Sequence, residues 1–221
     1  MSRKTLDQEL QMIRDDLLLL SNRVEQALIS SVAALKDHDM DKSRLVRDND
    51  EIINAKRFGL EGQIIVTIAT QSPAARDLRF LASSMNICTE LERIGDYAKA
   101  IANVNVRSGG INIPSLLITA KKMGLQTADM LHRAMTAFLE SDAETAKNII
   151  FEDDVVDSYY SNLYEASIQR MIADARMMQR INYVLWVAHS LERSADRVTN
   201  ICERTIYTET GLYQEAGDES L

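Results

Sequence analysis

Pairs of carboxylates four residues apart are the side chains in this sequence whose type and spacing could do chemistry. The motif Leu-Glu-Arg-Ile-Gly-Asp places Glu92 and Asp96 at this spacing, and Leu-Glu-Arg-Ser-Ala-Asp does the same with Glu192 and Asp196. On an α-helix, residues at this spacing lie on one face, one turn apart. Like charges there repel each other by roughly a few tenths of a kcal/mol, which a bound cation would offset. The spacing therefore indicates a metal-binding face on each of two helices.

A second acidic segment also occurs twice. Residues 50–54 read Asp-Glu-Ile-Ile-Asn and residues 153–157 read Asp-Asp-Val-Val-Asp, a separation of 103 residues against 100 for the first motif. Asp153 and Asp157 again have the spacing of one helical turn. Two matched acidic segments in the same order suggest an internal duplication. If the helices that carry them are neighbours, their acids converge on one site, as in carboxylate-bridged helix bundles.

Carboxylates suit hard or borderline cations, so the candidate cofactors are divalent or trivalent ions: Fe, Zn, Mn or Mg. The ordinary interpretation of an acidic pair is a solvated helix face, with Arg93 and Arg193 as neutralising neighbours. The repeat favours metal binding, because a solvated face does not need the same residues twice.

His189 is a candidate extra ligand or a partner-contact residue. Asn200 and Glu203 either support the site or are simply solvated.

The elements that must position these acids are long helices. Apolar residues recur every three or four positions through most of the chain, and 8 Gly, 2 Pro and 5% aromatic residues leave few turn formers and strand formers. Turn signals delimit six expected helices, at 6–37, about 41–71, 73–104, 116–139, 143–173 and 177–207. The predicted fold class is therefore all-α, with six long helices as two tandem, pseudo-symmetric three-helix bundles. The predicted repeats are residues 1–107 and 113–211, followed by a flexible tail at 212–221.

Single residues carry further expectations. Pro73 is expected in the first turn of the third helix, where its fixed φ is tolerated. Gly109 and its neighbour Gly110 are expected to form a hinge between the two halves. Trp186 lies in the apolar run YVLWVA and is expected in the core. The two cysteines, Cys88 and one at position 202, have no metal-finger spacing and are expected to be buried reduced thiols, which fits a cytoplasmic protein.

The composition disfavours several function classes. The net charge of −8 makes the chain a poor candidate for non-specific nucleic-acid binding and for direct attachment to an anionic membrane. Charges interrupt every apolar run, so neither a membrane span nor a signal peptide is expected, which again favours the cytoplasm. The sequence shows no nucleophile elbow, phosphate-cradling glycine loop or catalytic Cys–His pair, so an enzyme is not expected.

The segment QSPAARDLRF, followed by ELERIGDYAKAIA, is similar to the first half of the PhoU family, and HSLERSADRVTNICERTIYTETG is similar to its second half. This resemblance covers about residues 10–211. It implies an adaptor between the ATPase subunit of the phosphate ABC transporter and the phosphate-sensing histidine kinase. Such an adaptor represses the phosphate-starvation genes when phosphate is plentiful and restrains phosphate uptake. It would lie at the inner face of the membrane through its protein partners, as a monomer or a homodimer.

The resemblance also implies metal ions on the doubled motifs. By position, the metal ligands would be Asp50, Glu92, Asp96, Asp153, Asp157, Glu192 and Asp196. Asn54 stands where an acid is expected, which indicates a first site that is weaker or takes a different ion. The second motif departs from the family pattern at Ser194 and Ala195. The alternative function is a carboxylate-bridged metalloenzyme or metal-storage bundle, which is less favoured because no general base and no apolar substrate pocket can be identified.

Overall fold

The computed structural model describes residues 3–212, and this part of the chain is all-α, as predicted. Its long helices are α1 (Arg3–Asp37), α2 (Met40–Gln71), α3 (Ala75–Ser108), α4 (Pro114–Glu140), α5 (Ala143–Ala173) and α6 (Met178–Thr210). A short 3-10 turn, η1 (Ala175–Met177), precedes α6. Each helix begins and ends within a few residues of its expected position. The predicted tail at 212–221 lies almost entirely outside the described residues.

Local capping chemistry sets the ends of several helices. Asp39 precedes α2 and Asp142 precedes α5, and each carboxylate accepts a hydrogen bond from a backbone N–H three residues on. The donors are Lys42 and Thr145, both at 2.9 Å. These bonds satisfy N–H groups that have no partner inside the helix. Gly109 ends α3 with φ 65° and ψ 22°, left-handed angles that glycine adopts without strain.

Two local expectations are wrong. Pro73 lies before α3 rather than in its first turn, since the helix begins two residues later. Trp186 is 51% exposed rather than part of the core, and its ring meets Tyr183 edge to face with centroids 5.7 Å apart. Val184 and Val187 in the same apolar run are buried. The tryptophan between them projects from a different side of α6, because successive helical residues are rotated by about 100°.

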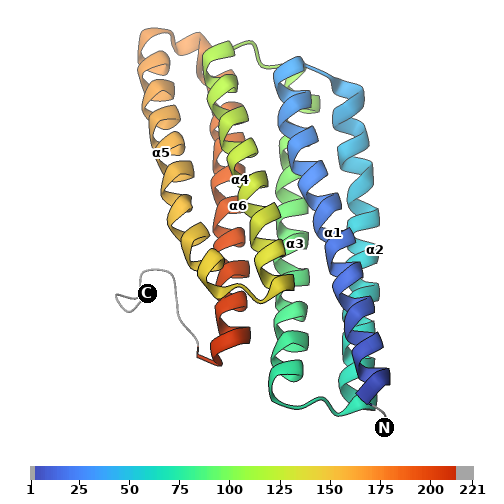
Figure 1. The fold of residues 1–221 in the computed structure, drawn as a ribbon. Coiled ribbons are helices and arrows are strands. Elements are labelled where there is room, and N and C mark those ends of the chain that lie inside the picture. Colours follow the sequence, from blue (N-terminus) through green and yellow to red (C-terminus); the bar gives the residue numbers. More distant parts are fainter. Residues whose placement is uncertain (1–2, 213–221) are drawn as a thin grey trace.

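The helices pack as a four-helix centre flanked by two outer helices (Figure 1). α1 contacts α4 and α3 contacts α6, so the two halves of the chain meet along two helix pairs. Among the described elements, α2 contacts only α1 and α3, whereas α5 contacts only α4, η1 and α6. Figure 1 shows α2 and α5 at opposite edges of the molecule. Each outer helix therefore has one face against its own half and one face without a helical neighbour.

One hydrophobic core runs through both halves. The ring of Phe80 on α3 stacks on Phe138 of α4, with centroids 5.3 Å apart. Gly124 of α4 lies so close to Val32 of α1 that a Cβ there would be 2.7 Å from Val32 Cγ1. Both cysteines are buried and unbridged. Within residues 3–212, no helix has the sustained apolar character that a membrane span requires.

Candidate metal centres

The second half of the chain brings four predicted ligands together from two helices. α5 supplies Asp153 and Asp157, and α6 supplies Glu192 and Asp196. Val156, next to Asp157 in the chain, is fully buried, so the acids of α5 border its packed face. The charges of Glu192 and Asp196 both act on Asp153, which places the two acidic pairs close to each other across the α5–α6 interface. We call these four residues the acidic cluster.

The acidic cluster has too little positive charge around it. Burial and the neighbouring carboxylates of Asp157 and Asp196 raise the pKa of Asp153 to about 7. Partial desolvation also raises the pKa of Asp157, an exposed residue, and that of Glu192, which is half-buried, again with a contribution from the charge of Asp196. Carboxylates retain protons in this way when desolvation and mutual repulsion outweigh the nearby cations. A metal ion would oppose these shifts by supplying the missing positive charge.

Two buried oxygens of the acidic cluster, Asp153 Oδ1 and Glu192 Oε2, have no hydrogen-bond partner. His189 Nδ1 lies 3.4 Å from Glu192 Oε2, at ion-pair distance but without hydrogen-bond geometry, so His189 lies on the acidic face. Asp196 is partly neutralised by Arg193, whose Nη1 lies 2.8 Å from Asp196 Oδ2. Buried polar atoms normally have partners. Carboxylate oxygens left without one are suitable ligands for a cation.

The first half has the equivalent acids but different electrostatics. Asp50 of α2 is only 2% exposed, and its Oδ2 accepts hydrogen bonds from Lys99 Nζ at 2.6 Å and from Asn54 Nδ2 at 3.1 Å. The bond to Asp50 raises the pKa of Lys99, and the charge of Asp96 contributes, so the ammonium stays protonated. Asp50 Oδ1 has no partner. Lys99 therefore places a positive charge beside Asp50, and the acidic cluster has no equivalent lysine.

Glu92 lies beside two arginines. Arg57 Nη1 is 3.6 Å from Glu92 Oε1, and Arg93 Nε is 3.8 Å from Glu92 Oε2. Arg57 also forms a salt bridge with Glu61, at 2.9 Å. The carboxylates of the first half thus have cations of the protein next to them. Their donor set fits a metal ion less well than that of the acidic cluster, because a bound ion would have to compete with these side chains.

The donor chemistry of the acidic cluster fits a hard or borderline cation, but its carboxylates do not surround a single point. Within residues 3–212, no three His, Cys, Asp or Glu side chains are arranged so that they hold one ion as they stand. Carboxylates that share a low-dielectric region repel one another, which favours this open arrangement. Holding one ion with three or more of these side chains would therefore require side-chain rotations on α5 and α6.

Asn200, one turn beyond Asp196, does not extend the acidic cluster. Its amide donates a hydrogen bond to Glu90 Oε2 of α3 at 3.2 Å, and Arg197 Nη1 lies 3.5 Å from the same oxygen. These contacts connect α6 to α3 across the two halves of the chain. Asn200 therefore supports the packing between the halves.

Sequence reasoning missed the cations of the first half. Lys99 and Asp50 are 49 residues apart and lie on different helices, so their contact has no signature in local spacing. The same holds for Arg57 and Glu92, which come from α2 and α3. The available signal was Asn54, which occupies the position of an acid in the duplicated segment and donates to Asp50.

The chain matches a known family over almost its full length. A family model described as the PhoU domain matches residues 17–104 and again residues 120–205. The phosphate-specific transport system accessory protein PhoU homolog of Clostridium acetobutylicum is 30% identical over 219 residues, which cover 99% of this chain and 100% of that protein. The phosphate-specific transport system accessory protein PhoU of Escherichia coli is 30% identical over 214 residues, covering 96% of this chain and 89% of that protein.

Solved structures agree with the sequence comparison. The crystal structure of PhoU from Pseudomonas aeruginosa has a TM-score of 0.89 and 30% identity, and the match covers 93% of this chain and 99% of that one. The phosphate transport system regulatory protein PhoU from Streptococcus pneumoniae has a TM-score of 0.87 and 29% identity, with 95% and 99% covered. The two domain matches confirm the internal duplication. By sequence and by structure, the chain belongs to the PhoU family.

Proposed function

We propose that this protein is a regulatory adaptor of phosphate transport. It couples the ATPase subunit of a phosphate ABC transporter to a phosphate-sensing histidine kinase, represses the phosphate-starvation response when phosphate is abundant, and restrains uptake. The observation that carries this proposal is the nearly full-length match to proteins named as phosphate-specific transport system accessory proteins. The adaptor works in the cytoplasm, at the inner face of the membrane through its protein partners, and catalyses no reaction.

We also propose that the acidic cluster binds a metal ion. Asp153 and Glu192, whose oxygens lack partners, and Asp157 and Asp196 beside them would hold it. When bound, the ion supplies positive charge to the cluster and links α5 to α6. In the first half, Lys99 holds Asp50 instead, so we expect that half to bind metal more weakly.

The ion has a regulatory role in this proposal rather than a structural one. The core that holds α5 and α6 in place consists of buried apolar side chains and does not include the acidic cluster. Chelation is therefore expected to leave the helical circular dichroism signal at 25 °C unchanged. A loss of helicity on chelation would instead make the ion a requirement for folding.

Elemental analysis of purified protein tests the metal proposal. Glu192→Gln with Asp196→Asn is expected to remove most of the bound metal, because the amides keep the shape of the side chains but carry no charge. The matched pair in the first half, Glu92→Gln with Asp96→Asn, is expected to retain it. Wild-type protein without metal, or equal losses in the two variants, would contradict an ion on the acidic cluster.

A deletion strain tests the adaptor role. Without the gene, an alkaline-phosphatase reporter of the phosphate-starvation response is expected to be active in abundant phosphate, and the wild-type gene is expected to restore repression. A reporter that stays repressed in the deletion strain would overturn the adaptor function. This outcome does not depend on the metal measurement, so the two proposals can fail separately.

A further inference from the structure

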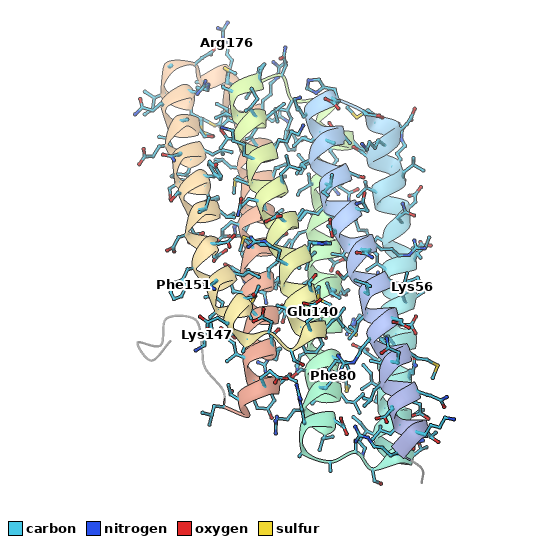
Figure 2. All side chains as sticks on the ribbon, in the orientation of Figure 1. Lys56, Phe80, Glu140, Lys147, Phe151 and Arg176 are labelled. Atoms are coloured by element: carbon cyan, nitrogen blue, oxygen red, sulfur yellow. The ribbon has the colours of Figure 1, made fainter. Side chains whose placement is uncertain are left out.

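A polar pocket lies at the end of the molecule where α1, α3, α6 and the turn between α4 and α5 meet. Its volume is about 350 Å³, within the range of small-molecule sites. The second half of the chain contributes Ser141 from the turn and Thr208 from α6. Figure 2 shows Phe80, a buried wall of this pocket, near Glu140, the last residue of α4. We call it the arginine pocket, because its walls include Arg3, Arg14 and Arg76.

Arg14 is the cation of the arginine pocket that has no acidic partner. It reaches the pocket from α1 and is partly buried. Its guanidinium lies over the ring of Phe80, 4.2 Å from the centroid, and its Nη1 donates to the backbone oxygen of Leu139 at 2.9 Å. Among residues 3–212, Arg14 forms no salt bridge, whereas Arg3 and Arg76 both do. A guanidinium has five N–H donors, so most of those of Arg14 remain available to a ligand.

The charges around Arg14 do not compensate its burial. Burial lowers the pKa of Arg14, and the positive charge of Arg76 lowers it further. The acids Asp77 and Glu209 act in the opposite direction, but the net shift is downward. The guanidinium still keeps its proton at neutral pH, because the ordinary pKa of arginine is far above 7. A desolvated cation beside a second cation is stabilised by a bound anion.

Two further groups of the arginine pocket can donate to an anion. Ser141 ends α4 with φ 63°, and its hydroxyl forms no hydrogen bond with the described residues. α3 begins beside the pocket, since Arg76 and Asp77 of its first turn line it, and no side chain caps this helix. The first N–H groups of a helix lack partners within it and carry partial positive charge, so they favour a negative ligand.

The acids that line the pocket are already paired. Arg3 Nε lies 2.8 Å from Asp7 Oδ1, and Arg3 Nη1 donates to Asp77 Oδ2. Asp77 is the less exposed of the two, with 22% of its side chain accessible against 52% for Asp7. The pocket therefore suits a small anion that contacts Arg14 and stays clear of Asp77. A large polyanion would be repelled by these carboxylates.

We propose that the arginine pocket binds one phosphate group, either free inorganic phosphate or that of a small phosphorylated metabolite. Arg14 donates through its available N–H groups and Ser141 through its hydroxyl, while Arg76 supplies a second positive charge. The planar fork of arginine matches two phosphate oxygens at once. The donors come from α1, from α3 and from the turn after α4. Approach from three elements suits a tetrahedral anion better than a planar carboxylate.

A phosphate group in this position contacts both halves of the chain. Arg14 belongs to the first half and already connects α1 to the end of α4 through Leu139. Ser141 belongs to the second half. Occupancy of the pocket therefore stabilises the contact between α1 and α4. The use of this binding as a phosphate signal rests on the adaptor function proposed above, but the binding itself does not.

Equilibrium dialysis of the full chain against radiolabelled inorganic phosphate tests the proposal. A chelator is included, so that no metal ion on the acidic cluster can hold the phosphate. Wild-type protein is expected to bind about one phosphate per chain, with a dissociation constant of about 1 mM or below. Arg14→Gln is expected to raise this constant at least about 10-fold, because it removes charge-assisted hydrogen bonds. Arg180→Gln, at an exposed position in the first turn of α6, is expected to change it less than about two-fold.

Competition with unlabelled glycerol 3-phosphate distinguishes the two sources of the phosphate group. Displacement at lower concentration than unlabelled inorganic phosphate would identify a phosphorylated metabolite as the preferred ligand, and the reverse order would identify inorganic phosphate. No binding of either compound up to about 10 mM would overturn the proposal, as would equal binding by wild type and Arg14→Gln. A failure here leaves the reporter measurement in the deletion strain unaffected, so the pocket and the adaptor function can fail separately.

Asp77→Asn provides a test in the opposite direction. This substitution removes a negative charge from the wall of the pocket and releases Arg3 to contact the ligand. It is expected to lower the dissociation constant for phosphate at least about 3-fold, an improvement that a damaged fold would not produce. Unchanged or weaker binding by Asp77→Asn would reject the arginine pocket as the phosphate site.

Discussion

Asp50 and Asp153 occupy corresponding positions in the two halves of the chain, yet their surroundings differ by two residues. Asn54 corresponds to Asp157, so one carboxylate is replaced by a hydrogen-bond donor in the first half. Lys99 corresponds to Thr199, whose hydroxyl donates only to the backbone oxygen of Asp196, at 2.8 Å. The first half thus gains a cation and loses an acid. The same fold supports a neutralised site on one side and an acidic cluster on the other.

The raised pKa of Asp153 predicts a pH-dependent stability of metal-free protein. Its pKa is about 7 in the folded protein and about 3.9 when unfolded, so the folded state holds an extra proton between these values. Stability therefore falls as pH rises from about 4 to about 7, and the full cost is present above that range. Asp153→Asn is expected to be about 1–2 kcal/mol more stable than wild type at pH 8, after allowance for solvent screening, and nearly equal at pH 4.

Urea denaturation in the presence of a chelator, at several pH values from 4 to 8, measures this difference. Asp37→Asn provides a control at an exposed aspartate, and its free energy of unfolding is expected to follow wild type throughout. A stabilisation that is the same at every pH would mean that Asp153 is not the group whose proton matters. Asp153→Asn is also expected to weaken metal binding, because the carboxylate charge that destabilises metal-free protein is the charge that would attract the ion.

The sequence predicted which acids share a helix face, because that depends only on the spacing of one turn. It did not predict that Lys99 reaches Asp50 or that Arg57 reaches Glu92, because these contacts join residues on different helices. Burial of Asp153 was equally invisible, since it depends on how closely α5 packs against α6. The electrostatics of the two sites therefore required the tertiary structure.

At the scale of helices, most ends could be predicted because capping is local. Asp39 and Asp142 cap the helices that immediately follow them, whatever the rest of the chain does. The outward faces were harder to predict. The apolar run around Trp186 suggested a core position, but α6 has neighbours on only part of its surface. The apolar residues of α2 likewise gave no indication of which of them face inward, because both sides of this helix carry them.

The α1–α4 contact depends on the absence of a side chain at Gly124. A Cβ there would lie 2.7 Å from Val32 Cγ1, which is too close for any packed pair of carbons. Gly124→Ala is therefore expected to lower the free energy of unfolding by about 1–2 kcal/mol, because overpacking exceeds the gain in helix propensity. Val32→Ala in the same chain should recover part of this loss. Thermal unfolding of the two single variants and of the double variant measures the coupling energy between positions 32 and 124. If the two changes in stability simply add, the contact between these residues is contradicted.

At the scale of the whole molecule, the two halves are repeats in sequence but share one core. Phe80 stacks on Phe138, and Arg14 of α1 donates to the backbone oxygen of Leu139 at 2.9 Å. Thr208 of α6 donates to Ser83 of α3 at 2.8 Å, in a buried position. The sequence predicted two tandem three-helix bundles, but it did not predict the surface between them, because periodicity reveals only the repeats. Because of these contacts, we expect each half to depend on the other for its stability.

Cutting the chain in the non-helical segment 109–113 tests this dependence. The fragment 1–109 alone would expose Phe80 and the rest of its surface toward α4 and α6, so we expect it to be poorly folded. Mixed with 110–221, it should recover helicity, because the contacts between halves do not need a covalent link. Trp186, the only tryptophan, lies in the second fragment beside Ala100 and Val104 of α3. Its fluorescence should therefore change on mixing, and a first fragment that unfolds cooperatively by itself would show that the repeats are independent domains.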